Sequence, residues 1–407
     1  MRHIDFRRVF VFAGLASLVI VYAILWLQMI ASPSERTGAD FIGFFTAARI
    51  FQKDGADKVY DPAYQQMIEQ QEVGFELVPG QVLLFNHLPY FLPLLNVIVD
   101  ANYVNSFIRW VIVLLVFLVI DAVFMAGLLP TQTFRRGDIL IAAAGALLFF
   151  PTFTSLMNGQ DTVFLLLGMT LWLYGMLSNR DVLAGLGLSL VTIRPQLALV
   201  LAVPLFFSKE RRRVCWWFMI GTILLGVLCL MILGWEGAHN LANFLLISAG
   251  GQWYGLHPED MPTLSGLIRR TAPGTDLYVI QFISWGIYLI AIAGLSIHFW
   301  KNKKIREQQI GLAVLVGLFV VPYLHYHDLA CLLIPIFCLA RVLVGGNFLE
   351  ARNTVLLPLA LSFFLLVGFY EFSIRYLVVY IVMIGVTSFL WFPDRLYRAF
   401  HLQRSTP

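Results

Sequence analysis

The sequence predicts an all-α polytopic membrane protein that forms a single domain over residues 1–407, with about 10–13 transmembrane helices. Hydrophobic residues make up 59% of the chain and charged residues only 13%, whereas soluble domains have about 25% charged residues. Apolar runs of about 20 residues recur along the whole length. The basic residues lie in short clusters between these runs, so the chain does not have the basic surface of a nucleic-acid-binding protein.

The apolar runs predict the membrane spans in order. The predicted full spans are 9–31, 104–129, 137–157, 161–178, 214–234, 277–299, 309–325, 328–344, 354–370 and 374–392. The first span is longer than the apolar region of a signal peptide, and we expect it to remain as an uncleaved helix.

Two further apolar stretches contain prolines and predict pairs of short or re-entrant helices. The first is 83–99, with Pro89 and Pro93, and the second is 181–207, which is interrupted at Arg194-Pro195. Proline removes a backbone donor and ends a helix. Because broken helices at membrane depth usually line a cavity, both stretches are candidates for the wall of a site.

The distribution of Lys and Arg predicts the orientation in the membrane. One topology places most of them in the cytoplasm together with both termini, as the positive-inside rule requires. The same topology places loops 32–88 and 236–276 outside. In the first of these loops, apolar residues share one face of a helix over Asp40 to Phe51, which predicts an amphipathic helix at the membrane interface. Asp61-Pro62 predicts the start of a second helix, with Asp61 as the cap.

Asp40 is the first candidate for catalysis, because it follows the first span directly and opens the interfacial helix. A carboxylate on the outer face suits the removal of a proton from an acceptor hydroxyl. Aspartate is also a common helix N-cap, and both interpretations stay open at this point.

Arg194 is the second candidate, since an arginine between two apolar half-helices is costly to bury and its guanidinium suits a phosphate. The alternative is a structural pair with an acidic residue inside the membrane. Gln196 follows it closely and shares this candidate site.

Further candidates lie where outer loops meet spans. His325 and His327 flank a tyrosine and suit phosphate or sugar binding, although a plain polar turn is the alternative. No third ligand accompanies them, so no metal site is predicted. The amides of Asn158 and Gln160 suit sugar hydroxyls, and Asp161 is expected to cap the next helix.

Adjacent Arg269 and Arg270 on the outer side suit an anionic headgroup, with a solvated surface as the alternative. His87 is a candidate for the pocket wall. The chain has no phosphate-binding glycine loop and no Gly-x-Ser-x-Gly or His-Glu-x-x-His motif, so an ATP-driven pump is not supported.

Taken together, these segments resemble glycosyltransferase family 87, which comprises bacterial integral-membrane enzymes of the GT-C class. The segments that carry the resemblance are Asp40-Phe41 with Ala47-Ala48, Gly55 with Val59-Tyr60-Asp61, Leu88 to Pro93, Asn158 to Gln160, Ala184-Gly185, Arg194 to Gln196, Ser265 to Arg270 and Tyr326 to Leu329. The family often has lysine at the position of Arg194, and arginine keeps that charge.

The resemblance implies a GT-C-type bundle and an inverting transfer of a hexose, with mannose as the expected sugar, from a polyprenyl-phosphate donor to a glycolipid or glycan acceptor. Asp40 would be the general base, and Arg194, His325, His327, Arg269 and Arg270 would bind the donor phosphate. Asn158, Gln160, Gln196 and His87 would contact the substrates. No cofactor, metal or nucleic acid is required, and the expected location is the bacterial inner membrane, with the site on the extracytoplasmic face.

The main alternative is a transporter or flippase for a lipid-linked or anionic envelope precursor, because such proteins also use broken helices around buried charges. Transporters often contain related halves, and the sequence shows none.

Overall fold

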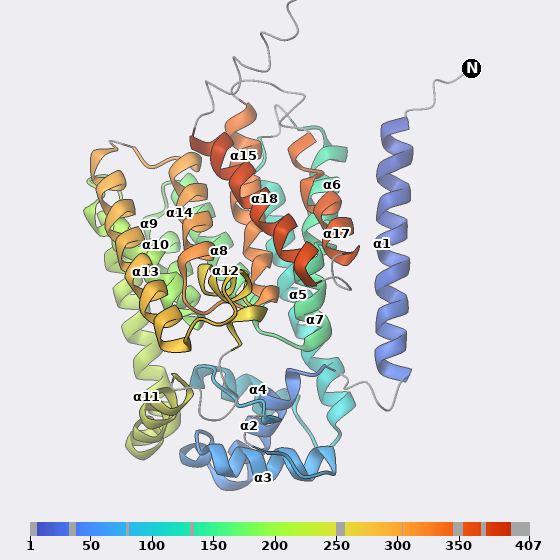
Figure 1. The fold of residues 1–407 in the computed structure, drawn as a ribbon, viewed down its shortest axis with the longest axis vertical. Coiled ribbons are helices and arrows are strands. Elements are labelled where there is room, and N and C mark those ends of the chain that lie inside the picture. Colours follow the sequence, from blue (N-terminus) through green and yellow to red (C-terminus); the bar gives the residue numbers. More distant parts are fainter. Residues whose placement is uncertain are drawn as a thin grey trace, which may run out of the picture.

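The computed structural model describes residues 6–31, 38–78, 81–130, 134–249, 257–302, 304–344, 353–367 and 372–391. Throughout this part of the chain the regular elements are all helices (Figure 1). The predicted all-α polytopic membrane fold is therefore confirmed.

Five helices within the described ranges are long and apolar enough to cross a membrane. They are α1 (Phe6–Ala31), α5 (Tyr103–Gly127), α11 (Arg212–Ala249), α13 (Leu277–Lys301) and the run formed by η6 (Tyr326–Leu332) with α15 (Leu333–Val344). A sixth span is bent by 42° between α6 (Arg136–Leu147) and α7 (Phe150–Asn158).

The other predicted spans correspond to shorter apolar helices. These are α8 (Thr162–Leu177), α14 (Glu307–Val320), α17 (Leu357–Val367) and α18 (Phe372–Trp391). The proline-bearing stretch 181–207 is a broken pair, as predicted: α9 (Asp181–Leu190) and η4 (Val191–Ile193) lead to Arg194, and α10 (Pro195–Phe207) follows. The long continuous helices are fewer than the predicted spans because several spans are short or interrupted.

Glycines bring α9 close to its neighbours. A Cβ atom on Gly175 of α8 would lie 2.4 Å from the backbone nitrogen of Ala184 in α9. On the other side, a Cβ on Gly185 would lie 2.3 Å from the Cβ of Trp217 in α11. Small residues at these contacts let helix backbones approach closely. This packing fixes the position of the chain that leads into Arg194.

A second layer of short helices lies below the bundle (Figure 1). It contains α2 (Phe41–Asp54), η1 (Ala56–Lys58), α3 (Pro62–Val73), η3 (Pro89–Phe91) and α4 (Leu92–Ile98). The carboxylate of Asp61 accepts hydrogen bonds from the backbone N–H groups of Ala63 and Tyr64, at 3.0 and 3.1 Å. The predicted cap of α3 is confirmed.

The helix predicted over Asp40 to Phe51 is present as α2, but its environment differs from the prediction. Residues on nearly all sides of its first turns are buried, including Thr46 and Ala47 as well as the expected Phe41 and Phe44. The prediction of a single buried face is therefore wrong for these turns, because α3, α4 and α5 pack around α2. A position of this helix at the membrane interface stays a prediction.

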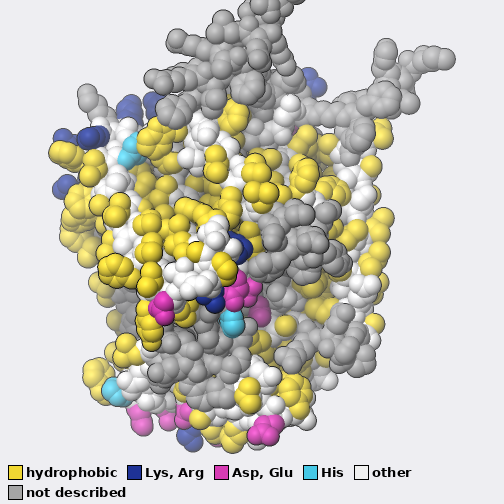
Figure 2. Space-filling model, viewed as in Figure 1, with side chains coloured by type: hydrophobic (Ala, Val, Ile, Leu, Met, Phe, Trp, Pro, Cys, Tyr) yellow, Lys and Arg dark blue, Asp and Glu magenta, His cyan; other side chains and the backbone are white. Residues whose placement is uncertain are grey.

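The kinds of side chain on the visible surface also differ between the bundle and its two ends (Figure 2). Hydrophobic side chains cover much of the visible face of the bundle, and acidic side chains gather at its centre and at the lower end (Figure 2). Lys and Arg side chains cluster at the opposite end, near the end of α13. The bundle thus has a basic end, with the lower layer at the other end.

Candidate active site

Asp40 directly precedes α2 but does not cap this helix with its side chain. Its backbone is already helical, with φ −82° and ψ −14°, and its carboxylate makes no capping hydrogen bond. Instead, Oδ2 of Asp40 accepts a hydrogen bond of 2.8 Å from Nε2 of Gln160. The N-cap interpretation of Asp40 is therefore wrong, and the catalytic interpretation stays a prediction.

The turn between α7 and α8 holds Gln160 against α2. Gly159 has φ +74°, a conformation that favours glycine, and a Cβ there would lie 2.7 Å from the Cβ of Phe41. The indole Nε1 of Trp110 donates to the carbonyl of Gly159 at 2.8 Å, and the backbone N–H of Gln160 donates to that of Ser155 at 2.8 Å. The amide that holds Asp40 is thus positioned by the bundle.

Directly beside Gln160 lies a buried cluster of charges. Arg194 donates through Nη2 to Oδ1 of Asp161 at 3.0 Å and through Nε to Oδ2 of Asp328 at 3.1 Å. Both carboxylates are fully buried, and the arginine side chain is 14% exposed. Nδ1 of His87 lies 2.7 Å from the second oxygen of Asp161. One arginine thus joins two buried acids from distant parts of the chain.

Asp328 extends the cluster to the histidine motif. Its Oδ1 accepts a hydrogen bond of 2.9 Å from the hydroxyl of Thr162, and its Oδ2 accepts one of 3.3 Å from the backbone N–H of His325. Nε2 of His327 lies 3.8 Å from Oδ1 of the same carboxylate. The position of the motif therefore depends on Asp328.

Asp161 was expected to cap α8, and this prediction is wrong, because its carboxylate makes no capping hydrogen bond. It is paired with Arg194 and His87 instead, since a fully buried carboxylate needs charged partners. The sequence pattern predicts no role for Asp161 beyond a cap and none for Asp328 or Thr162. The sequence does contain one indication, because an arginine buried between apolar helices needs an acidic partner. It does not show which acid that partner is.

The two histidines of the motif have different environments. Their rings stack with centroids 5.4 Å apart, yet His325 is exposed while His327 is buried. Asp40 is close enough to act electrostatically on both rings. His325 is therefore the member of the pair that a ligand near Asp40 can reach.

Arg269 and Arg270 lie in α12 (Leu264–Thr271) and have other partners. The guanidinium of Arg270 lies 3.8 Å from the ring centroid of Tyr376 and donates to the carbonyls of Glu259 and Met261 at 2.6 and 3.0 Å.

Arg269 donates to the carbonyls of Pro273 and Thr275 at 2.8 and 3.1 Å. Both arginines thus hold the backbone of the loops around α12. Within the described residues, no contact joins either of them to Arg194.

The other predicted substrate contacts flank the cluster. Asn158 ends α7, two residues before Gln160. Gln196 lies in the first turn of α10, and its backbone carbonyl accepts a hydrogen bond of 2.8 Å from the hydroxyl of Tyr288. Within the part of the chain that the structure describes, no three His, Cys, Asp or Glu side chains form a group that could hold a metal ion.

Fold and site together define a polytopic helical membrane protein with a buried charged cluster where the bundle meets a layer of short helices. The sequence model of Glycosyltransferase family 87 matches residues 89–335, more than half of the chain, and the protein therefore belongs to this family. No curated protein and no solved structure matches significantly. The matched segment contains Gln160, Arg194 and His325, whereas Asp40 precedes it and is joined to it by the hydrogen bond to Gln160.

The match shows that the protein is a glycosyltransferase, as predicted, and gives no support to the alternative of a transporter or flippase.

Proposed function

We propose that this glycosyltransferase moves a hexose from a polyprenyl-phosphate sugar to a hydroxyl of a glycolipid or glycan, with inversion at the anomeric carbon. The observation that carries the proposal is the carboxylate of Asp40, which does not cap its helix and is held by Gln160 beside the buried cluster. A carboxylate fixed in this way, beside a cluster whose Asp328 also holds the backbone of exposed His325, supports a general base facing a phosphate-binding group.

In the proposed reaction, Asp40 takes the proton of the acceptor hydroxyl as its oxygen attacks the anomeric carbon. The new glycosidic bond forms on the face opposite to the bond between the sugar and the phosphate oxygen. That bond breaks, and its electron pair leaves with the polyprenyl phosphate. One displacement therefore inverts the anomeric centre, and no covalent intermediate with the protein is needed.

Negative charge builds on the phosphate as it leaves, and hydrogen-bond donors aimed at it lower the barrier. We assign this role first to His325, because a histidine ring offers an N–H donor in either charge state and this ring is exposed.

Arg194 has a different main role in the proposal. Its single positive charge faces the two buried carboxylates of Asp161 and Asp328, so these three groups together are not a positive site. Arg194 therefore acts mainly as a positioning residue that ties the Gln160 turn to the His325 motif.

The proposed orientation places the lower layer and the active site outside the membrane and the basic end in the cytoplasm. Basic loops remain on the cytoplasmic side of membrane proteins, and most of the visible Lys and Arg side chains gather at the end of the bundle away from the lower layer (Figure 2). A donor with a lipid tail would then reach the site from within the bilayer, consistent with a bacterial inner-membrane enzyme.

A transfer assay tests the proposal. The purified protein is incubated with polyprenyl-phosphate mannose or glucose and an acceptor glycolipid, and the anomeric configuration of the product is determined by NMR spectroscopy. A product of inverted configuration is expected. Transfer only from a nucleotide sugar, or with retained configuration, would contradict the proposal.

Replacement of His325 by alanine is expected to lower kcat/KM for the donor by about 10- to 100-fold, because a hydrogen bond to a charged group contributes about 1.5–3 kcal/mol. Steady-state kinetics over a range of donor concentrations measure the effect. His239→Ala is the matched control, since His239 is an exposed histidine of α11 and makes no contact with the cluster. Equal kcat/KM values for H325A and H239A would contradict the role of His325 at the leaving phosphate.

A further inference from the structure

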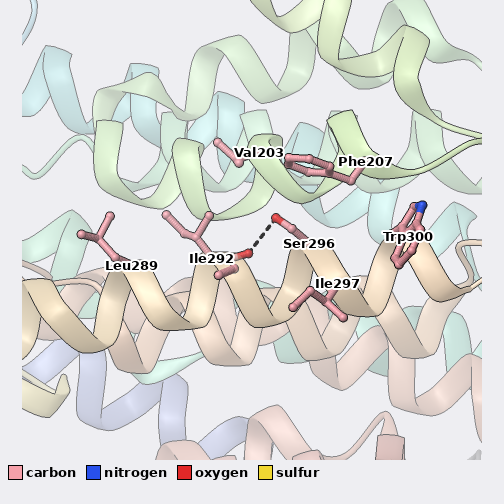
Figure 3. A pocket seen from close by; sticks show the side chains of 8 residues that line it. Val203, Phe207, Leu289, Ile292, Ser296, Ile297 and Trp300 are labelled. Carbon is pink, nitrogen blue, oxygen red and sulfur yellow. Dashed lines mark hydrogen bonds between the residues drawn. The ribbon is translucent and has the colours of Figure 1, made fainter.

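An apolar groove lies between α10 and α13, far along α10 from Arg194. Its volume is about 400 Å³, and Val203 and Phe207 of α10 face Leu289, Ile297 and Trp300 of α13 across it (Figure 3). The one hydroxyl in the groove, that of Ser296, donates to the carbonyl of Ile292 at 2.7 Å. The lining of the groove is therefore almost entirely apolar.

A polar cavity of about 290 Å³ follows the groove at the basic end of the same two helices. Phe207, at the end of α10, is followed by Glu210 and Arg211 of the cavity wall. Trp300, near the end of α13, is followed by Lys304 and Arg306. Along each of the two helices, the apolar lining thus gives way to a charged lining within a few residues.

The acids of this cavity already have partners. Oε2 of Glu210 accepts a hydrogen bond of 3.0 Å from the backbone N–H of Ile305, and Glu307 pairs with Arg341 at 3.0 Å.

The buried side chain of Arg211 donates to Oδ1 of Asp181 at 3.1 Å, while its Nε has no hydrogen-bond partner within the described ranges. Lys304 and Arg306 are exposed, and the structure records no ion pair for either among the described residues. The cavity therefore has cationic groups left for an anion.

We propose that the groove and the cavity together bind one anionic phospholipid, with an acyl chain between α10 and α13 and the phosphate beside Lys304 and Arg306. An apolar slot, followed along both chain segments by a cationic cavity at the basic end of a helix bundle, has the complementary chemistry of such a lipid. In the proposed orientation this lipid belongs to the cytoplasmic leaflet.

The lipid site is separate from the active site. The 13 residues of α10 lie between Arg194 and the loop that contains Glu210 and Arg211, a distance of about 20 Å along the helix. Because one end of α10 carries Arg194 and the other borders the lipid, occupancy would also steady α10 and with it the position of Arg194. The binding itself does not depend on the transfer reaction.

Native mass spectrometry and thermal unfolding of the detergent-purified protein test this inference. Added phosphatidylglycerol is expected to bind and raise Tm, and phosphatidylcholine with the same acyl chains to do so much less. Glycerol phosphate without acyl chains is expected to leave Tm unchanged. If glycerol phosphate stabilises as strongly as the lipid, the site binds a soluble phosphate compound and the lipid proposal fails. If phosphatidylcholine binds equally, the cationic cavity plays no part and the proposal also fails.

Variants separate the cavity from general surface charge. Lys304→Gln with Arg306→Gln is expected to weaken phosphatidylglycerol binding by about 10- to 30-fold, since each basic residue near an anionic headgroup contributes up to about fivefold. The matched control, Lys209→Gln with Arg213→Gln, removes two exposed positive charges from the same end but outside the cavity. Equal losses in the two double variants would overturn the site.

A separate variant tests whether an acyl chain occupies the groove. Ala293→Phe fills the slot without changing any charge and is expected to weaken lipid binding as well. Unchanged binding in A293F would show that no acyl chain occupies the groove. Transfer activity is measured in parallel, so a failure of lipid binding is distinguishable from a failure of the proposed reaction.

Discussion

Asp40→Asn is expected to lower kcat for sugar transfer by about 100- to 10,000-fold, the usual contribution of a general base. The change removes the basic carboxylate while keeping its shape. The side-chain carbonyl oxygen of the substituted asparagine can still accept the 2.8 Å hydrogen bond that Gln160 donates in the native protein. Folding and donor affinity should therefore persist, and the loss should appear in single-turnover rates at saturating donor.

Asp61→Asn is the matched control for this experiment. Asp61 belongs to the same layer and accepts capping hydrogen bonds from Ala63 and Tyr64, a role that asparagine fills equally well. Its activity should remain close to that of the native protein. Full activity of D40N in the same assay would rule out Asp40 as the base.

Arg194→Ala should destabilise the protein by about 3–5 kcal/mol, because it leaves the carboxylates of Asp161 and Asp328 buried without their shared cation. Loss of transfer activity should accompany the loss of stability, since Asp161 adjoins Gln160 and Asp328 holds the backbone of His325. Thermal unfolding in detergent and denaturant titration measure the first effect.

A compensated variant distinguishes charge balance from a general packing defect. Arg194→Met together with Asp161→Asn and Asp328→Asn removes all three charges and should lose less stability than R194A alone. Unchanged stability of R194A would show that the two ion pairs do not support the fold. A triple variant as unstable as R194A would indicate that packing of the arginine side chain matters more than its charge.

The sequence was sufficient for the fold class, the approximate spans, the break at Arg194-Pro195 and the cap at Asp61, because each depends on local hydropathy or on proline and capping chemistry. It was misleading for α2, where the pattern of phenylalanines suggested one buried face. Burial on the remaining sides comes from other helices that pack against α2. The spacing of hydrophobic residues within α2 does not show these contacts.

The same limit explains the site. Arg194 lies between apolar helices, so the sequence indicates that it needs an acidic partner. The choice of Asp161 and Asp328 depends on how the segments that carry these three residues meet in the fold. Asp161 looked like a cap because aspartate before a helix usually is one. Arg270 looked free because its backbone partners and Tyr376 come from separate parts of the chain.

The hydrogen bond between Gln160 and Asp40 crosses the boundary between the helix bundle and the lower layer. The proposed base thus belongs to one layer, while His325 and its supporting acids belong to the other. A family built on this plan can replace α2, α3 and α4 to receive a different acceptor and still keep the groups that we propose to bind the donor. The range of acceptors and the range of donors can then change independently during evolution, provided that the side-chain amide of Gln160 still donates its hydrogen bond to Asp40.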